Sequence, residues 1–209
     1  LWARVRDRSA KSGPWSVRIS VLASFRCSVD GTDLASVGGK TSGKPLALLR
    51  RIAVQGGYEG IGTDLIATAL WPGEGREGRD KALEVTLARL RRLLGRADAV
   101  LLHDRRLRLN PHRVWLDRVA LERCLDTICD GAAASRGNPA THERTWATVW
   151  SLWRGPLLAV EPDAGWIAAP RDRLRARLAA ALHGAAGTPG HRARSLRARS
   201  ADPRLDAWL

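Results

Sequence analysis

The sequence predicts an α+β domain on the amino-terminal side, built from a small antiparallel sheet and three helices, with an all-α domain after it. Apolar and polar residues alternate with the period of a strand between residues 17 and 30. Apolar residues recur at helical spacing from residue 45 to 95, and two short alternating runs follow at residues 100–110. From residue 119 onward the apolar residues recur with the helical period alone.

The front of the α+β domain is expected to be a small antiparallel sheet. Residues 17–22 (VRISVL) and 24–30 (SFRCSVD) alternate as half-buried strands do, and Asp30-Gly31 is a hairpin turn signal. We expect a short third strand at residues 34–37. Residues 1–16 are charged and have no stable period, so we expect a mostly disordered leader there.

A glycine-rich loop leads into the first predicted helix. Residues 38–45 (GGKTSGKP) approach the phosphate-binding pattern GxxxxGK, but Pro45 stands where a hydroxyl should reach Mg²⁺, and no buried strand precedes the loop. We therefore interpret Pro45 as a residue in the first turn of a helix that runs to Gln55. A second helix is expected at residues 64–71, with Thr63 as its cap.

The third predicted helix, residues 80–95, has two contrasting faces. A leucine stripe at i, i+4, i+7 and i+11 covers one face and consists of Leu83, Leu87, Leu90 and Leu94. The opposite face is small and cationic, has Arg91 on its flank, and consists of Lys81, Val85, Ala88, Arg89 and Arg92. Asp80 is placed to cap this helix, and Gly95 to end it in a left-handed conformation. Such a helix suits the major groove of DNA, and a surface helix with solvated arginines is the alternative.

A hairpin with a basic tip is predicted next. Residues 100–103 and 107–110 flank Asp104-Arg105-Arg106, as two strands flank their turn. We expect residues 114–116 to pair as a further strand and Asp117 to cap the following helix. Strands, three helices and a basic hairpin, in this order, are typical of a winged helix-turn-helix domain.

The charge of the chain favours an anionic partner such as nucleic acid or a membrane surface, because the formal net charge is +14. Most of the cations are Arg, which a GC-rich genome supplies through codon usage, so the position of the charges counts for more than their total. Residues 76–113 hold 11 Lys and Arg against 5 Asp and Glu, which concentrates positive charge on the third helix and the hairpin.

Four segments make a family resemblance specific: LWPGEG, KALEVTLARLRRLLG, VLLHDRRLRLNPHRVWLD and LWRGPLL. They resemble the bacterial transcriptional activators that join an OmpR-type winged helix to a TPR-like bacterial transcriptional activator domain, among them the streptomycete antibiotic regulatory proteins. The resemblance covers roughly residues 17–186. It implies a front sheet of four strands, and double-stranded DNA held by the third helix and the hairpin.

Carried over by position, the resemblance implies a set of DNA-contacting residues: Lys81, Thr86, Ala88, Arg89, Arg91, Arg92, Arg105 and Arg106. Thr86 and Ala88 stand where relatives often have longer polar side chains such as His, which implies a narrower direct reading of bases. We expect Thr86 to touch a thymine methyl group, and the hairpin arginines to follow the phosphate backbone or enter a narrow minor groove. The resemblance also implies a homodimer on DNA and a contact between the loop at residues 56–62 and RNA polymerase.

The second half of the chain predicts helices at residues 119–130, 141–153 and 166–182. The tryptophan stripe of the middle helix is more typical of a core than of a ligand pocket. Helical pairs that cannot bury their own apolar faces stack on one another, and the resemblance implies a TPR-like domain here. The expected organisation is a leader at 1–16, an OmpR-type winged helix at 17–117, a TPR-like domain at 118–186, and a linker with a partial helical repeat, cut short, at 187–209.

The function that these observations favour is sequence-specific DNA binding for transcription control, as an activator in the bacterial cytoplasm at the nucleoid. A protein-interaction adaptor is the alternative, because fold alone does not fix function. An enzyme is not expected, since GxSxG, HExxH and a complete P-loop are absent and the five His are scattered. Three Cys without a CxxC pair predict a reducing compartment and no metal site; no cofactor and no membrane span are expected.

Overall fold

A computed structural model of the chain describes residues 15–34, 43–133, 139–161 and 165–185. These residues form two compact units, which we call the winged-helix unit and the helical unit. Within the described ranges, the winged-helix unit comprises residues 15–21 and 25–116, and the helical unit comprises residues 22–24 and 117–185. The expected leader, apart from residues 15 and 16, and the expected partial repeat lie outside the described residues.

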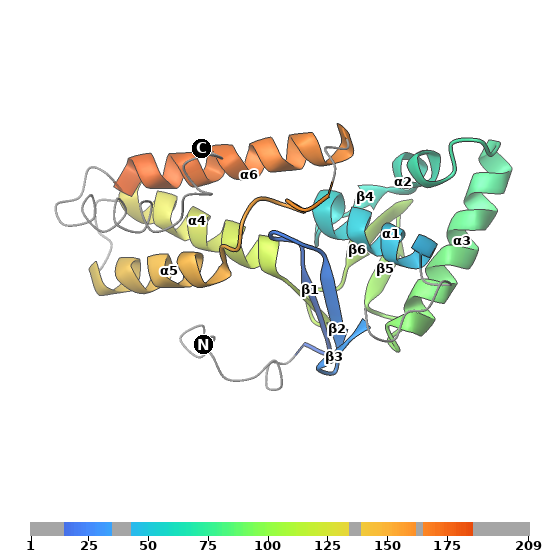
Figure 1. Ribbon diagram of the computed structural model, residues 1–209, viewed down its shortest axis with the longest axis horizontal. Coiled ribbons are helices and arrows are strands. Elements are labelled where there is room, and N and C mark those ends of the chain that lie inside the picture. Colours follow the sequence, from blue (N-terminus) through green and yellow to red (C-terminus); the bar gives the residue numbers. More distant parts are fainter. Residues whose placement is uncertain (1–14, 35–42, 134–138, 162–164, 186–209) are drawn as a thin grey trace. The chain divides into compact units, whose positions relative to one another are not determined.

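A four-stranded sheet opens the winged-helix unit (Figure 1), with the strand order β3-β2-β1-β7. Its strands are β1 (Val17–Ser20), β2 (Arg26–Val29), β3 (Thr32–Asp33) and β7 (Val114–Leu116). Strand β7 runs parallel to β1, and the other neighbours are antiparallel. The alternation predicted for the first strand is confirmed, because Val17 and Ile19 are fully buried while the Arg18 guanidinium lies over the Trp115 ring, 4.5 Å from its centroid.

The implied fourth strand of this sheet is the one expected at residues 114–116. The third strand lies earlier than predicted, because β3 ends at Asp33, and residues 35–37 lie outside the described residues. The short hairpin between β2 and β3 turns at Asp30 and Gly31, which both have positive φ, so the turn signal is confirmed.

Three helical segments follow the sheet. They are α1 (Gly43–Arg51), which continues as the π-helical η4 (Ile52–Gly56), α2 (Thr63–Leu70) and α3 (Arg76–Leu93). Pro45 lies in the first turn of α1, as expected. Leu48, Leu49 and Ile52 are fully buried, so the apolar face predicted for the first helix forms part of the core.

The helix starts were predicted less well than the helix ends. Helix α2 begins at Thr63 itself, and no side chain caps it. Helix α3 begins at Arg76, so Asp80 lies inside the helix and does not cap it. The added turn consists of polar residues that carry no apolar period, although Arg and Glu favour the helix. The end is confirmed, because α3 is followed by Gly95 with φ +61.

The predicted hairpin is confirmed and has an additional strand. Strands β5 (Val100–His103) and β6 (Arg106–Leu109) pair antiparallel, and we call residues 100–109 the wing. Strand β4 (Ile61–Gly62), which was not predicted, pairs with the other side of β6 and gives the order β4-β6-β5. Because β4 leads directly into α2, the backbone ties the wing to the helix-turn-helix.

The helical unit contains the three predicted helices: α4 (Asp117–Ala133), α5 (Pro139–Leu152) and α6 (Gly165–Ala185). Helix α4 lies between α5 and α6 (Figure 1) and contacts both. Asp117, the first residue of α4, is buried, and its carboxylate accepts hydrogen bonds from the backbone N–H groups of Arg118 (2.7 Å) and Leu22 (3.1 Å). The fold class is therefore the predicted one, an α+β winged helix followed by an all-α region.

Candidate nucleic-acid interface

Helix α3 is anchored by its leucines. Leu83, Leu87, Leu90 and Leu94, which we call the leucine ridge, are all at most 6% exposed. The helix packs on α1 and α2, so the ridge faces the core of the winged-helix unit. The predicted anchoring face is confirmed, and the other side of α3 is left to solvent.

The opposite side of α3 is an exposed, mostly cationic surface. It consists of Lys81, Val85, Ala88, Arg89 and Arg92, and we call it the outer face of α3. Glu84, also exposed, lies at its edge, and Glu77 and Asp80 lie in the turn before Lys81. Among the described residues, the side chains of Lys81, Arg89 and Arg92 have no hydrogen-bond or ion-pair partner. Their charges are therefore available to a ligand.

Two of the α3 residues in the predicted DNA-contacting set do not lie on the outer face. Thr86 is only 6% exposed, because it is three residues after Leu83 and four before Leu90, on the buried side of the helix. The expectation that Thr86 reaches a thymine is wrong for this conformation. Arg91 is half-buried, and its Nε and Nη2 both donate to the carbonyl oxygen of Val100, at 3.1 and 2.9 Å. Arg91 therefore fastens α3 to the beginning of the wing.

The tip of the wing is a two-residue turn. Asp104 and Arg105 both have positive φ, +48° and +55°, which is the backbone of a type I′ hairpin turn. Arg106 belongs to β6 and pairs with His103 across the hairpin. Both arginines were predicted to lie at the tip, but only Arg105 occupies the turn itself.

Both wing arginines have partners within the winged-helix unit. Arg105 Nη2 lies 2.7 Å from Asp64 Oδ1, at the start of α2, and 3.9 Å from Asp80 Oδ1 of α3. Arg106 Nη2 donates to the carbonyl oxygen of Gly60 at 2.6 Å. The wing tip thus lies beside Asp80 of α3, the residue before Lys81. Its arginines have partners, whereas the side chains of the outer-face arginines have none among the described residues.

The close approach of the loop before β4 to the wing requires a glycine. Gly60 has φ +95, and a Cβ built on it would lie 3.3 Å from the carbonyl oxygen of Leu107 and 3.4 Å from Cβ of Arg108. Arg108 is exposed on β6 and is an additional cation of the wing that we did not select from the sequence. The signal for it was present, since arginine and leucine alternate from Arg106 to Leu109.

The loop at residues 56–62, expected to meet RNA polymerase, is largely covered. Glu59 is its one exposed residue. The carbonyl oxygen of Gly57 accepts a hydrogen bond from Leu109 N at 2.9 Å, and Tyr58 Oη donates to the carbonyl oxygen of Val114 at 2.8 Å. This loop therefore supports the wing and offers a partner little side-chain surface.

The helical unit offers less for a ligand. Trp146 and Trp153 are each 6% exposed, and the Trp146 and Trp150 rings stack with centroids 5.5 Å apart, so the tryptophan stripe is core, as predicted. Arg171 lines an open hollow of about 570 Å³, and its side chain donates hydrogen bonds to the carbonyl oxygens of Leu157 and Leu158. The hollow is thus lined by a side chain that already stabilises the connector before α6.

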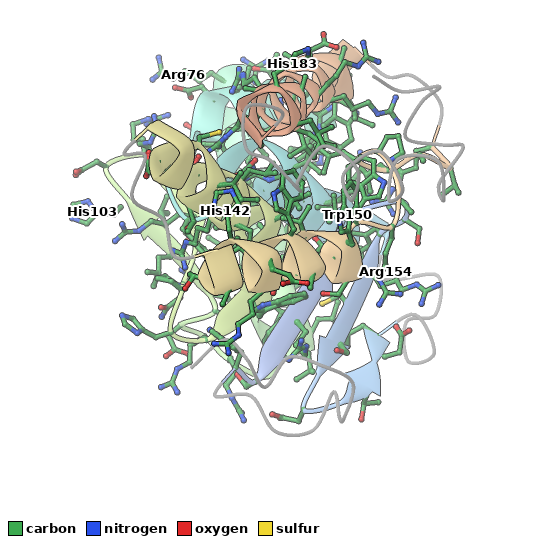
Figure 2. All side chains as sticks on the ribbon, turned by 90° about the vertical axis from the view of Figure 1, so that its left-hand side faces the viewer. Arg76, His103, His142, Trp150, Arg154 and His183 are labelled. Atoms are coloured by element: carbon green, nitrogen blue, oxygen red, sulfur yellow. The ribbon has the colours of Figure 1, made fainter. Side chains whose placement is uncertain are left out.

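No histidine cluster suggests catalysis or metal binding in the described parts of the chain. His142 on α5 and His183 on α6 lie on separate helices (Figure 2). The described residues contain no group of three or more His, Cys, Asp or Glu that is arranged to hold a metal ion. None of the described helices combines the length and the apolar character needed to cross a bilayer.

Comparison with known proteins supports the architecture. No protein-family model matches the chain, and no curated protein matches it significantly in sequence. A solved structure of Mycobacterium tuberculosis EmbR in complex with a low-affinity phosphopeptide is similar to it, with a TM-score of 0.59 and 20% sequence identity. The match covers 81% of this chain and 45% of the EmbR chain, so the chain spans less than half the length of that protein. At this identity the likeness shows a shared fold, a winged helix followed by a helical region.

Proposed function

We propose that this chain binds double-stranded DNA in a sequence-dependent manner and thereby controls transcription, with α3 in the major groove and the wing beside it. The observation that carries the proposal is the contrast between the two sides of α3. The leucine ridge is buried, whereas Lys81, Arg89 and Arg92 on the outer face are exposed and have no partner among the described residues. An α-helix fits the major groove, and a helix anchored in this way presents its cations to it.

The chemistry of the outer face fits base edges as well as phosphates. Arg89 and Arg92 can each pair with a guanine, which is worth about 1–3 kcal/mol of discrimination per good bidentate pair. Val85 and Ala88 are short and apolar, so they allow the helix backbone to approach the bases and can contact a thymine methyl group. Lys81, together with the wing, would neutralise phosphates and release counterions, which supplies sequence-independent affinity.

The proposal extends to the organisation of the chain. Residues 17–117 would act as the DNA-binding domain, with Lys81, Ala88, Arg89, Arg92, Arg105 and Arg106 at the interface. Residues 118–186 would form a TPR-like domain that supports a homodimer on DNA. An activator in the bacterial cytoplasm would reach RNA polymerase from this position, and Glu59 is the residue of the 56–62 loop that is exposed enough to take part.

A selection of bound sequences from a random pool of DNA duplexes tests this proposal. We expect one motif to be enriched. Arg89→Ala should weaken binding to the selected duplex by about 5- to 150-fold, the equivalent of about 1–3 kcal/mol, and binding to a scrambled duplex much less. Arg173→Ala is the matched control, because Arg173 is an exposed arginine of α6 without a partner among the described residues. It should leave both affinities unchanged.

Two outcomes would contradict the proposal in different ways. Equal losses for Arg89→Ala and Arg173→Ala on the selected duplex would show that α3 does not read the bases. If the wild-type protein binds no duplex even at low salt, the proposed DNA binding is wrong. The adaptor function, in which the winged helix serves a protein partner, would then be the remaining alternative.

A further inference from the structure

The arginine at the wing tip is neutralised by two carboxylates from the helix-turn-helix. Arg105 Nη2 lies 2.7 Å from Asp64 Oδ1 and 3.9 Å from Asp80 Oδ1. Asp64 is in the first turn of α2, and Asp80 is in α3, immediately before Lys81 of the outer face. The cation at the wing tip is therefore paired, whereas the side chains of Arg89 and Arg92 are not.

The ion pair is not what holds the wing tip in place. The carbonyl oxygen of Arg105 accepts a hydrogen bond from the backbone N–H of Thr63 at 2.8 Å, and β4 pairs with β6 through Gly62 and Arg106. These backbone hydrogen bonds fix the tip against the start of α2. Loss of a carboxylate would consequently change the charge around Arg105 and leave the tip where it is.

The pair is weak enough for a ligand to replace it. The side chains of Arg105, Asp64 and Asp80 are 56%, 66% and 45% exposed. Exposed ion pairs contribute little free energy, since water screens them and both side chains lose freedom. Arg105 makes a single hydrogen bond to Asp64, whereas a phosphate can accept two charge-assisted hydrogen bonds from a guanidinium.

We propose that Asp64, assisted by Asp80, withholds Arg105 from DNA phosphates until a matching duplex seats α3 in its groove; this inference rests on the proposed function. A non-matching duplex, held by loose electrostatic attraction, leaves Arg105 on its carboxylates. A matching duplex brings its backbone against the wing tip, and a phosphate replaces Asp64. The two carboxylates thus determine specificity by reducing the affinity for non-matching DNA, although they contact no base.

We call the pairing of Arg105 with Asp64 and Asp80 the latch. A double-mutant cycle distinguishes the latch from a general effect of removing a negative charge. It uses the full chain as wild type, Asp64→Asn, Arg105→Gln and the double variant, each titrated with the selected and a scrambled duplex over a series of salt concentrations. Asp64→Asn should tighten binding to the scrambled duplex by about two- to fivefold, the range of exposed ion pairs. It should also steepen the slope of log K against log salt by about 0.9, the value of one additional phosphate contact.

The dependence on Arg105 is the deciding result. Arg105→Gln alone should barely change binding to the scrambled duplex, because the arginine is already occupied, and in the Asp64→Asn background it should cancel the gain. Glu84→Gln is the matched control, because Glu84 is exposed at the edge of the outer face and has no ion pair among the described residues. Its gain should be the same with and without Arg105.

The outcomes test the latch and the proposed DNA binding separately. If Asp64→Asn tightens binding equally in both backgrounds, or not at all, the latch is wrong and the DNA-binding proposal stands. If none of the four proteins binds a duplex, the proposed function fails and the latch fails with it. Should Asp64→Asn lower the melting temperature substantially, Asp80→Asn provides a second carboxylate variant in the same cycle, with the same expected dependence on Arg105.

Discussion

Leu90→Ala should destabilise the winged-helix unit strongly, whereas Val85→Ala, five residues earlier on the opposite side of the same helix, should not. Leu90 is fully buried in the leucine ridge, and Val85 is 43% exposed on the outer face. Buried Leu→Ala substitutions cost about 2–5 kcal/mol, since they lose transfer free energy and leave a cavity. Because Leu90 is fully buried, about 3 kcal/mol is expected for it. Surface substitutions usually change stability by less than about 0.5 kcal/mol.

Amide hydrogen exchange measured by mass spectrometry is the suitable assay, because it reports on the winged-helix unit separately from the helical unit. The readout is the exchange rate of β6, the central strand of the wing sheet. When exchange requires opening of the unit, a loss of about 3 kcal/mol accelerates it by about 10²-fold. Val85→Ala should change the rate by less than about threefold.

The comparison refutes the reasoning if the two variants exchange alike. Equal acceleration would mean that Val85 is as much a part of the core as Leu90, and that α3 has no free side. A slow exchange in Leu90→Ala would mean that the leucine ridge does not anchor α3. Either result would remove the basis for assigning the outer face to a ligand.

Three further outcomes follow from contacts inside the winged-helix unit. Arg91→Ala removes two hydrogen bonds to the carbonyl oxygen of Val100, the first residue of β5, and should lower the free energy of unfolding by about 1–3 kcal/mol. The salt dependence of DNA binding should stay unchanged, and a flatter salt dependence would show that Arg91 contacts a phosphate. Gly60→Ala should destabilise the wing by about 1–3 kcal/mol in chemical denaturation, because Gly60 has φ +95 and an added Cβ would press on the Leu107 carbonyl oxygen. An unchanged denaturation midpoint would show that the loop before β4 does not need a glycine at this position. Burial, and secondarily the charge of Asp33, raises the pKa of the Cys27 thiol to about 12 from its usual 9.0, so the folded state keeps a proton that the unfolded state loses above pH 9. The free energy of unfolding should therefore fall between about pH 9 and pH 12 more steeply in wild type than in Cys27→Ala, and parallel pH profiles would exclude this cause.

The parts of the fold that could be predicted from the sequence are those with a long local period. The leucine ridge repeats over three turns of α3, so its burial followed from spacing alone. The hairpin of the wing was recognisable because two alternating runs flank a polar turn. In both cases the residues that define the element lie close together in sequence.

The parts that were missed depend on neighbours distant in sequence or on very short segments. Strand β4 has two residues, too few for any period, and is defined by its pairing with β6. Thr86 was assigned to DNA because the resemblance carried it over by position, although its spacing from Leu83 and Leu90 places it on the buried side of α3. The pairing of Arg105 with Asp64 joins residues 41 positions apart. The first turn of α3 was taken for a loop because it has no apolar residue to mark its face.

The salt dependence of DNA binding by a protein with a neutralised outer face tests the central claim most directly. Lys81, Arg89 and Arg92 would each be replaced by Gln in one protein. In a matched control, three exposed arginines of the helical unit, Arg144, Arg154 and Arg173, would be replaced in the same way; Figure 2 shows Arg154 extending away from the helices.

Both proteins lose three positive charges, so a difference between them reports on position. If the outer face of α3 meets the duplex, its variant should have a log K against log salt slope that is shallower by up to about 2.7, at about 0.9 per phosphate contact, and should lose the preference for the selected duplex. The control should retain both the slope and the preference. Equal slopes in the two variants, with the preference intact in both, would contradict the assignment of α3 to DNA.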